Sequence, residues 1–166
     1  MQSHDRRGGV LGVMRAAGGL TLLAVGAVHL QRYLTGYESI PTIGPLFLLN
    51  AIGAGIVGIL LLVPFDRKLA PWRANVSVGL LALAGLAIAA GALIALAISE
   101  SSSLFGFSEH GSGAPIIAAI VSEAATVLLL GPLAVVRLAR AVAQDRSATP
   151  RSAWADRSTP SRTRAG

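Results

Sequence analysis

The chain has no cysteine and few charged residues, and these two shortages exclude several classes of protein. None of its 166 residues is cysteine, and only 13% are Asp, Glu, Lys or Arg. Without thiols the chain has no disulfide framework, thiol relay, Cys-ligated zinc site or iron–sulfur cluster. A charged fraction about half of the usual ~25% excludes an ordinary soluble domain. Aromatic residues are also scarce at 5%, so aliphatic side chains dominate.

The apolar residues are gathered into four long stretches. Hydrophobic residues make up 53% of the chain before its 19 glycines are counted, which excludes an intrinsically disordered protein. The stretches cover residues 10–33, 43–63, 74–98 and 115–136, and each is long enough to cross a hydrocarbon core of ~30 Å as a helix. Backbone groups in lipid must be paired internally. The sequence therefore predicts an all-α integral membrane four-helix bundle over residues 10–142, after a short segment at 1–9.

Proline and the C-terminal composition indicate where these helices begin and end. Pro45 and Pro115 fall in the first turn of a predicted helix and Pro71 just before one, positions where proline is tolerated. Pro132 follows Gly131 late in the fourth helix and should kink or interrupt it, with a short amphipathic extension after it. Residues 143–166 are rich in Arg, Ser, Thr and Pro, which predicts a disordered basic tail that contacts anionic lipid headgroups.

The basic residues are distributed unevenly along the chain. Every Lys and Arg except Arg32 lies near the N-terminus, between the second and third stretches, or after the fourth. The positive-inside rule then predicts that both termini are cytoplasmic. The excess of Arg, Ala and Gly is typical of a high-GC bacterium, so we expect the bacterial cytoplasmic (inner) membrane. The basic residues form no stripe interleaved with aromatics, so no nucleic-acid partner is predicted; a homo-oligomer stays open.

Ionisable side chains inside the apolar stretches need a partner or a function, because burying them in lipid is costly. Glu123 is the clearest, at roughly 12 Å beyond Pro115 for a rise of 1.5 Å per residue. All four predicted helices place a polar group in the outer half of the membrane, and no comparable set is expected in the inner half. We interpret the outer set either as a structural hydrogen-bond network or as a cavity that opens outward. Its members are His29, Arg32, Tyr33, Asn50, Glu100 and Glu123.

No catalytic residue, metal ligand or cofactor site is predicted. A haem held by two histidines needs two intramembrane histidines, and only His29 lies in an apolar stretch. A hydrolase would need a second histidine or a carboxylate cluster. The favoured function is non-enzymatic, with the polar cluster binding a ligand or a partner helix. Two alternatives remain: an oligomeric proton- or cation-coupled transporter that uses Glu123, and a lipid-modifying enzyme with His29 and Glu123 as acid and base.

One part of the chain carries a more specific pattern. The run HLQRYLTGYESIPTIGPLFLLNAIGAG (residues 29–55), with SLFGFSEH (residues 103–110), resembles a group of uncharacterised small four-helix integral membrane proteins of actinobacteria. In that group a His-Leu pair closes the first helix, and the IPTIGPLFLLN segment opens the second. The resemblance implies the four-helix architecture and a site on the outer face. It implies no activity.

Overall fold

The computed structural model describes residues 2–101 and 113–148, with side chains over 8–99 and 113–147, and these ranges are helical throughout apart from short connections. The long helices are α1 (Gln2–Leu34), α2 (Ile43–Leu62), α3 (Pro71–Ser101) and α4 (Ala114–Ala148), with short 3₁₀ helices η1 (Tyr37–Ser39) and η2 (Phe65–Lys68) between the first three. All four long helices are long and apolar enough to cross a membrane, which confirms the predicted helical architecture. The SLFGFSEH run and the tail after residue 148 lie outside the described residues.

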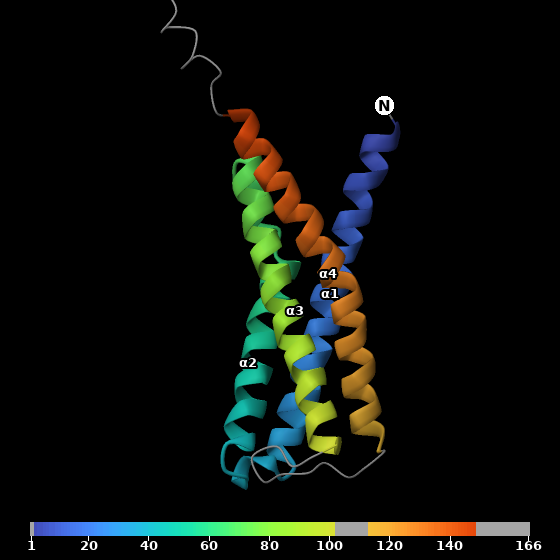
Figure 1. Ribbon diagram of the computed structural model, residues 1–166, viewed down its shortest axis with the longest axis vertical. Helices are drawn as coiled ribbons and strands as arrows, with labels where there is room; N and C mark the ends of the chain where they lie inside the picture. Colours follow the sequence, from blue (N-terminus) through green and yellow to red (C-terminus); the bar gives the residue numbers. More distant parts are fainter. Residues whose placement is uncertain (1, 102–112, 149–166) are drawn as a thin grey trace, which may run out of the picture.

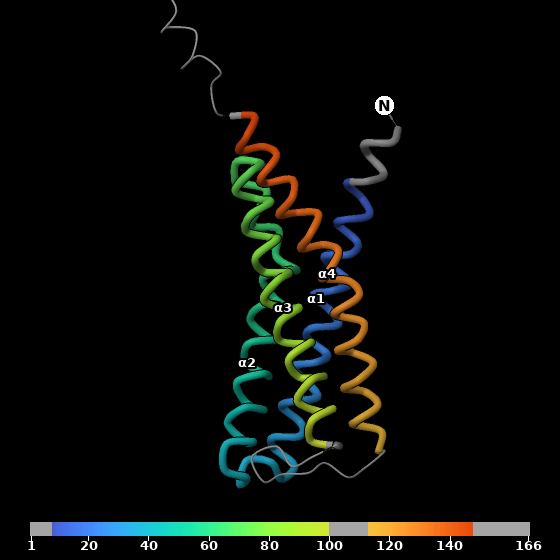
Figure 2. The backbone as a smooth tube through the Cα atoms, in the orientation of Figure 1, coloured from blue at the N-terminus to red at the C-terminus, as the bar shows by residue number. Residues whose placement is uncertain are grey.

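The four helices run alternately in opposite directions, as Figures 1 and 2 show. Helix α1 packs along α2 and α4, and α3 packs along α4, whereas the contact between α2 and α3 is thinner. We call the lower end in Figure 1 the η1 end, where α1 and α3 finish and α2 and α4 begin. The upper end, which holds the start of α1, η2 and the last turns of α4, is the η2 end.

The bundle is aliphatic both in its centre and on its outer surface. Its core contains Leu22, Leu61, Leu130 and Leu133, none more than 1% exposed. Large apolar side chains also cover the outside of every helix; examples are Leu20, Ile56, Ile94 and Leu128, between 56% and 73% exposed. Such an apolar outer surface would be unfavourable in water and suits hydrocarbon. These features together indicate a multi-pass membrane protein.

The helix boundaries differ from the expected ones mainly at the η2 end. Helix α1 begins at Gln2, within the segment predicted to precede it, and α4 continues to Ala148 without a break. Residues 143–148 are therefore helical rather than part of a tail. Pro132 lies inside α4 and does not interrupt it, although Figure 1 shows that the helix changes direction along its length. Proline has no backbone N–H, so Pro132 removes one hydrogen bond from the helix and bends it. The helix does not break, because it is packed against its neighbours on both sides of the proline.

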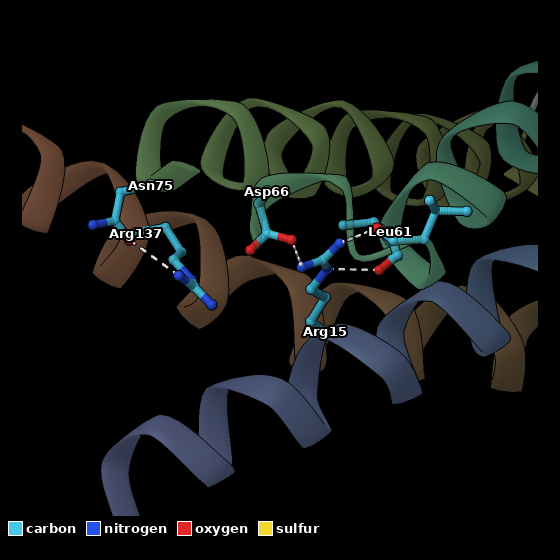
Figure 3. A network of polar contacts seen from close by, with 6 residues as sticks. Arg15, Leu61, Asp66, Asn75 and Arg137 are labelled. Atoms are coloured by element: carbon cyan, nitrogen blue, oxygen red, sulfur yellow. Dashed lines mark hydrogen bonds and ion pairs between the residues drawn. The ribbon is translucent and has the colours of Figure 1, made fainter. Parts of the chain in front are cut away.

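A buried arginine from α1 holds the end of α2 (Figure 3). Arg15 is 9% exposed and uses three nitrogens: Nε donates to the Leu61 carbonyl at 2.6 Å, Nη2 to the Val63 carbonyl at 2.5 Å, and Nη1 to Asp66 at 2.6 Å. Its guanidinium also lies 5.7 Å from the Phe65 ring centre. The last carbonyls of a helix have no partner within the helix, so Arg15 supplies partners for them and fixes η2.

A second polar group joins α3 to α4 at the same end. Asn75 is 6% exposed; its Oδ1 accepts a hydrogen bond from Arg137 Nη1 at 3.1 Å, and its Nδ2 donates to Gln144 Oε1 at 3.2 Å. A polar set therefore also lies at the η2 end of the bundle. Each of these pairs joins residues more than forty positions apart, so their proximity depends on how the helices pack.

Replacing Arg15 with methionine should destabilise the protein, because it leaves the Asp66 carboxylate and two helix-end carbonyls without their partner. We expect a loss of about 3 kcal/mol, typical of breaking a buried ion pair on one side. Thermal unfolding in detergent measures it, with Arg73→Met as the matched control, since Arg73 is exposed at the same end and lies over Trp72. If the two substitutions lower the unfolding temperature equally, the hydrogen bonds of Arg15 to Leu61, Val63 and Asp66 do not stabilise the fold.

Candidate functional site

A cavity of about 130 Å³ lies at the η1 end, and all four helices line it. Its polar lining residues are His29 and Arg32 from α1, Asn50 from α2, Ser99 from α3 and Glu123 from α4. The remaining lining is apolar. Four of the six residues predicted as a polar cluster are thus brought together by the packing. Tyr33 does not line the cavity, and the side chain of Glu100 lies outside the described residues.

Glu123 and His29 form a buried acid–imidazole pair across α4 and α1. Glu123 is 2% exposed, and its Oε1 lies 3.6 Å from His29 Nε2, in electrostatic contact but beyond a direct hydrogen bond. His29 Nδ1 lies 3.0 Å from the Val25 carbonyl, which can only accept, so this nitrogen carries a proton. The other ring nitrogen, Nε2, faces the Glu123 carboxyl group. The contact is favourable when a proton lies either on Nε2 or on the carboxyl group.

Two acceptor oxygens at this cavity have no hydrogen-bond partner. Glu123 Oε2 and Asn50 Oδ1 are both buried, and no donor among the described residues reaches them. Leaving a buried acceptor unpaired costs about 1–3 kcal/mol, and more where the group is charged. Both oxygens belong to residues that line the cavity.

An aromatic wall separates the acid–imidazole pair from the η1 connection. The Phe47 ring centre lies 5.1 Å from that of His29 and 4.8 Å from that of Tyr37. Tyr37 Oη accepts a hydrogen bond from Arg32 Nη2 at 2.7 Å, and the same guanidinium lies 4.7 Å from the Tyr37 ring centre. Sequence reasoning missed Phe47 and Tyr37, although both belong to the run at residues 29–55, because it weighed only ionisable and amide groups inside the helices.

The η1 connection lies close against the first turn of α2. The Ile43 amide donates to the Pro41 carbonyl at 2.8 Å around Thr42, whose φ of 69° is unfavourable for a β-branched residue. A Cβ at Gly44 would lie 2.6 Å from the Tyr37 carbonyl oxygen. Only glycine allows this contact, and it places Tyr37 beside Phe47 and Arg32.

Comparison of the chain with protein-family models, with curated proteins and with solved structures found no match. The chemistry of the cavity therefore rests on its own residues. Across the part of the chain that the structure describes, no three His, Asp or Glu side chains gather as ligands for a metal ion. The arrangement is suited to binding a molecule by hydrogen bonds within apolar and aromatic walls.

Replacing Gly44 with alanine should destabilise the η1 end, because the added methyl group meets a backbone carbonyl that cannot move freely. We expect a loss of roughly 1–3 kcal/mol, typical of overpacking. Gly55→Ala is the matched control: it lies in the same helix, and an added Cβ there meets nothing within 4 Å. Thermal unfolding in detergent compares the two variants. If Gly44→Ala unfolds at the same temperature as Gly55→Ala, the tight approach has no energetic role.

Proposed function

We propose that the chain is a non-enzymatic ligand-binding protein of the bacterial cytoplasmic membrane, with both termini in the cytoplasm. The η1 end would then face outward, which agrees with the position of Arg67, Lys68 and Arg73 at the opposite end. The resemblance to small four-helix proteins of actinobacteria is part of this proposal. The ligand is a small molecule held in the cavity between the four helices.

The observation that carries the proposal is a pair of unpaired buried oxygens, Glu123 Oε2 and Asn50 Oδ1, in two residues that line the same cavity. A chain that needed Glu123 only to hold its helices together would be expected to pair both carboxylate oxygens. A ligand with an amine or hydroxyl donor would satisfy these oxygens. Its apolar part would contact Phe47, Leu46 and Ile116, which line the same space.

The size of the cavity limits the ligand. Cavities of about 150 Å³ in protein interiors hold a benzene-sized molecule, and about 130 Å³ is slightly smaller. The ligand class is therefore a small amphipathic donor, or one end of a longer molecule that continues between the helices into lipid. The aromatic ring of Phe47, which lines the cavity, suits either a flat ring or a cationic amine.

A transporter that uses Glu123 is the second candidate, favoured by the buried contact between Glu123 and His29. The core argues against a path through one chain. Leu22 lies about two turns from both His29 and Arg15 along α1, and is fully buried with Leu130 and Leu133. These side chains close the interior between the two polar ends, so transport would require a path between copies of the chain.

Native mass spectrometry of the protein released from lipid nanodiscs tests ligand binding. The wild type should retain a small bound mass, and Glu123→Gln should lower its occupancy about tenfold, the effect of losing one charged hydrogen bond. Glu38→Gln is the matched control, because Glu38 is an exposed carboxylate at the same end. Bare chains for all three proteins would refute the binding proposal.

Flux measurements in proteoliposomes separate the transporter from the binding protein. If the chain transports protons or cations, Glu123→Gln should abolish ion-dependent flux while Glu38→Gln leaves it unchanged. A binding protein shows no flux in any of the three forms. A lipid-modifying enzyme, the third candidate, would instead change the lipid composition of the vesicles over time.

A further inference from the structure

An apolar groove lies on the outer surface of the bundle between α2 and α3, near the η2 end. Its volume is about 420 Å³, and it is lined by Leu60, Phe65, Ser77, Leu80 and Leu81. Apart from the Ser77 hydroxyl, these side chains are apolar. The contact between α2 and α3 is thinner than the contacts of α1 with α2 and of α3 with α4, and this leaves space between the two helices.

The groove is open to its surroundings on both sides. Leu80, on the α3 side, is 54% exposed, and Leu60, on the α2 side, is 39% exposed. A molecule in the membrane can therefore contact both walls without any change in the fold. Atoms that line an unfilled groove lose dispersion contacts, and packing of this kind drives association in lipid. A flexible acyl chain from the bilayer is suited to filling such a groove.

A basic side chain flanks the groove at the η2 end of each wall. On α3, Arg73, Ser77 and Leu80 are spaced by four and three residues, so they lie on one face of the helix. In η2, Phe65 and Lys68 are three residues apart, which places them on one side of a 3₁₀ helix. Lys68 and Arg73 are both exposed. An anion at this end of the groove can therefore contact either side chain.

The length of α3 indicates the depth of these basic residues in the membrane. Helix α3 has 31 residues and is about 46 Å long, so it extends beyond a hydrocarbon core of ~30 Å. Trp72, in its first turn, is 47% exposed, and tryptophan is enriched at the membrane–water boundary. The Arg73 guanidinium lies 5.4 Å from the Trp72 ring centre. Leu80 is about 10 Å further along the helix, at the depth of the acyl chains.

The charges at this end of the groove favour an anionic partner. Asp66, which lies between Phe65 and Lys68 in the chain, contacts Arg15 at 2.6 Å. In the described part of the chain, neither Lys68 nor Arg73 forms an ion pair. Basic groups beside a groove between membrane helices attract anionic headgroups. A second copy of the chain in the same orientation would instead bring its own basic residues alongside, which charge repulsion disfavours.

We propose that this groove binds one anionic phospholipid, with an acyl chain between α2 and α3 and the headgroup phosphate held by Lys68 and Arg73. The acyl chain supplies contact area, and the two cations supply the preference for a negative headgroup. The site lies at the opposite end of the bundle from the cavity, so it does not depend on the function proposed for that cavity.

Native mass spectrometry of the full chain in detergent micelles tests the headgroup. The probes are dioleoyl phosphatidylglycerol and dioleoyl phosphatidylcholine, which have the same acyl chains. The wild type should bind phosphatidylglycerol more tightly. The double variant Lys68→Gln, Arg73→Gln should lower this affinity about 25-fold, because each cation near an anionic membrane surface contributes about fivefold. Arg67→Gln is the matched control: Arg67 is exposed in η2 but lies on a different side of it from Lys68.

A second pair of variants tests the acyl chain in the same experiment. Ser77→Phe places a ring in the groove and should lower the affinity for both phospholipids about tenfold, as expected for overpacking. Ala87→Phe adds the same ring at an exposed position of α3 outside the groove and should leave both affinities unchanged. If Ser77→Phe does not fold, the variants of the exposed basic residues decide the proposal.

The proposal is supported if the wild type prefers phosphatidylglycerol and the double variant loses that preference while Arg67→Gln keeps it. It is overturned if the wild type binds both phospholipids equally, or if the double variant binds phosphatidylglycerol as tightly as Arg67→Gln does. It is also overturned if the wild type is a dimer that Ser77→Phe converts to a monomer, because a second copy then occupies the groove.

Discussion

The rest of this structure depends on one constraint: polar groups within a bundle that is apolar inside and out must find their partners in the chain. Helical hydrogen bonds satisfy most of the backbone, but the carbonyls at the end of α2 are left over. Arg15 donates to two of them and also holds Asp66 in η2. One side chain from α1 thereby ties the end of α2 to the beginning of the connection to α3.

The same constraint gives the molecule two polar ends separated by a mainly aliphatic middle, in which the hydroxyl oxygens of Thr21 and the buried Thr126 lie 2.9 Å apart. At the η1 end, the contact between Glu123 and His29 leaves Glu123 Oε2 and Asn50 Oδ1 unpaired on a cavity. At the η2 end, Asn75 accepts a hydrogen bond from Arg137 Nη1, whereas Arg137 Nε has no partner among the described residues. The two ends are chemically opposite. The unpaired atoms at the first end are acceptor oxygens, and the unpaired atom at the second end is the donor Nε of Arg137, with the buried Leu22 and Leu130 between the two ends.

Some residues of the candidate site could be placed together from the sequence, and others could not. His29, Arg32, Asn50 and Glu123 could be placed together because each lies near the same end of an apolar stretch, where distance along a helix gives depth. Phe47 could not, since an aromatic residue in an apolar run has no special signal, and Tyr37 could not, because it lies in the connection between two apolar stretches. Arg15 was counted only as a charge near the N-terminus, although it is buried and bonded to residues 61, 63 and 66. The Gly131–Pro132 pair predicted a kink or a break, and α4 changes direction along its length but stays continuous.

By itself the amino-acid sequence determined the helical class, the number of apolar stretches and the segregation of basic residues to one end. These properties depend on composition and on the length of each apolar stretch. A stretch long enough to cross the lipid must be helical, because its backbone groups have to be paired internally. Only the tertiary structure decided which polar groups meet. The pairs of Arg15 with Asp66 and of Arg137 with Asn75 connect residues 51 and 62 positions apart, and the contact of His29 with Glu123 joins α1 to α4. Such contacts depend on the rotation and register of packed helices, which no local pattern specifies.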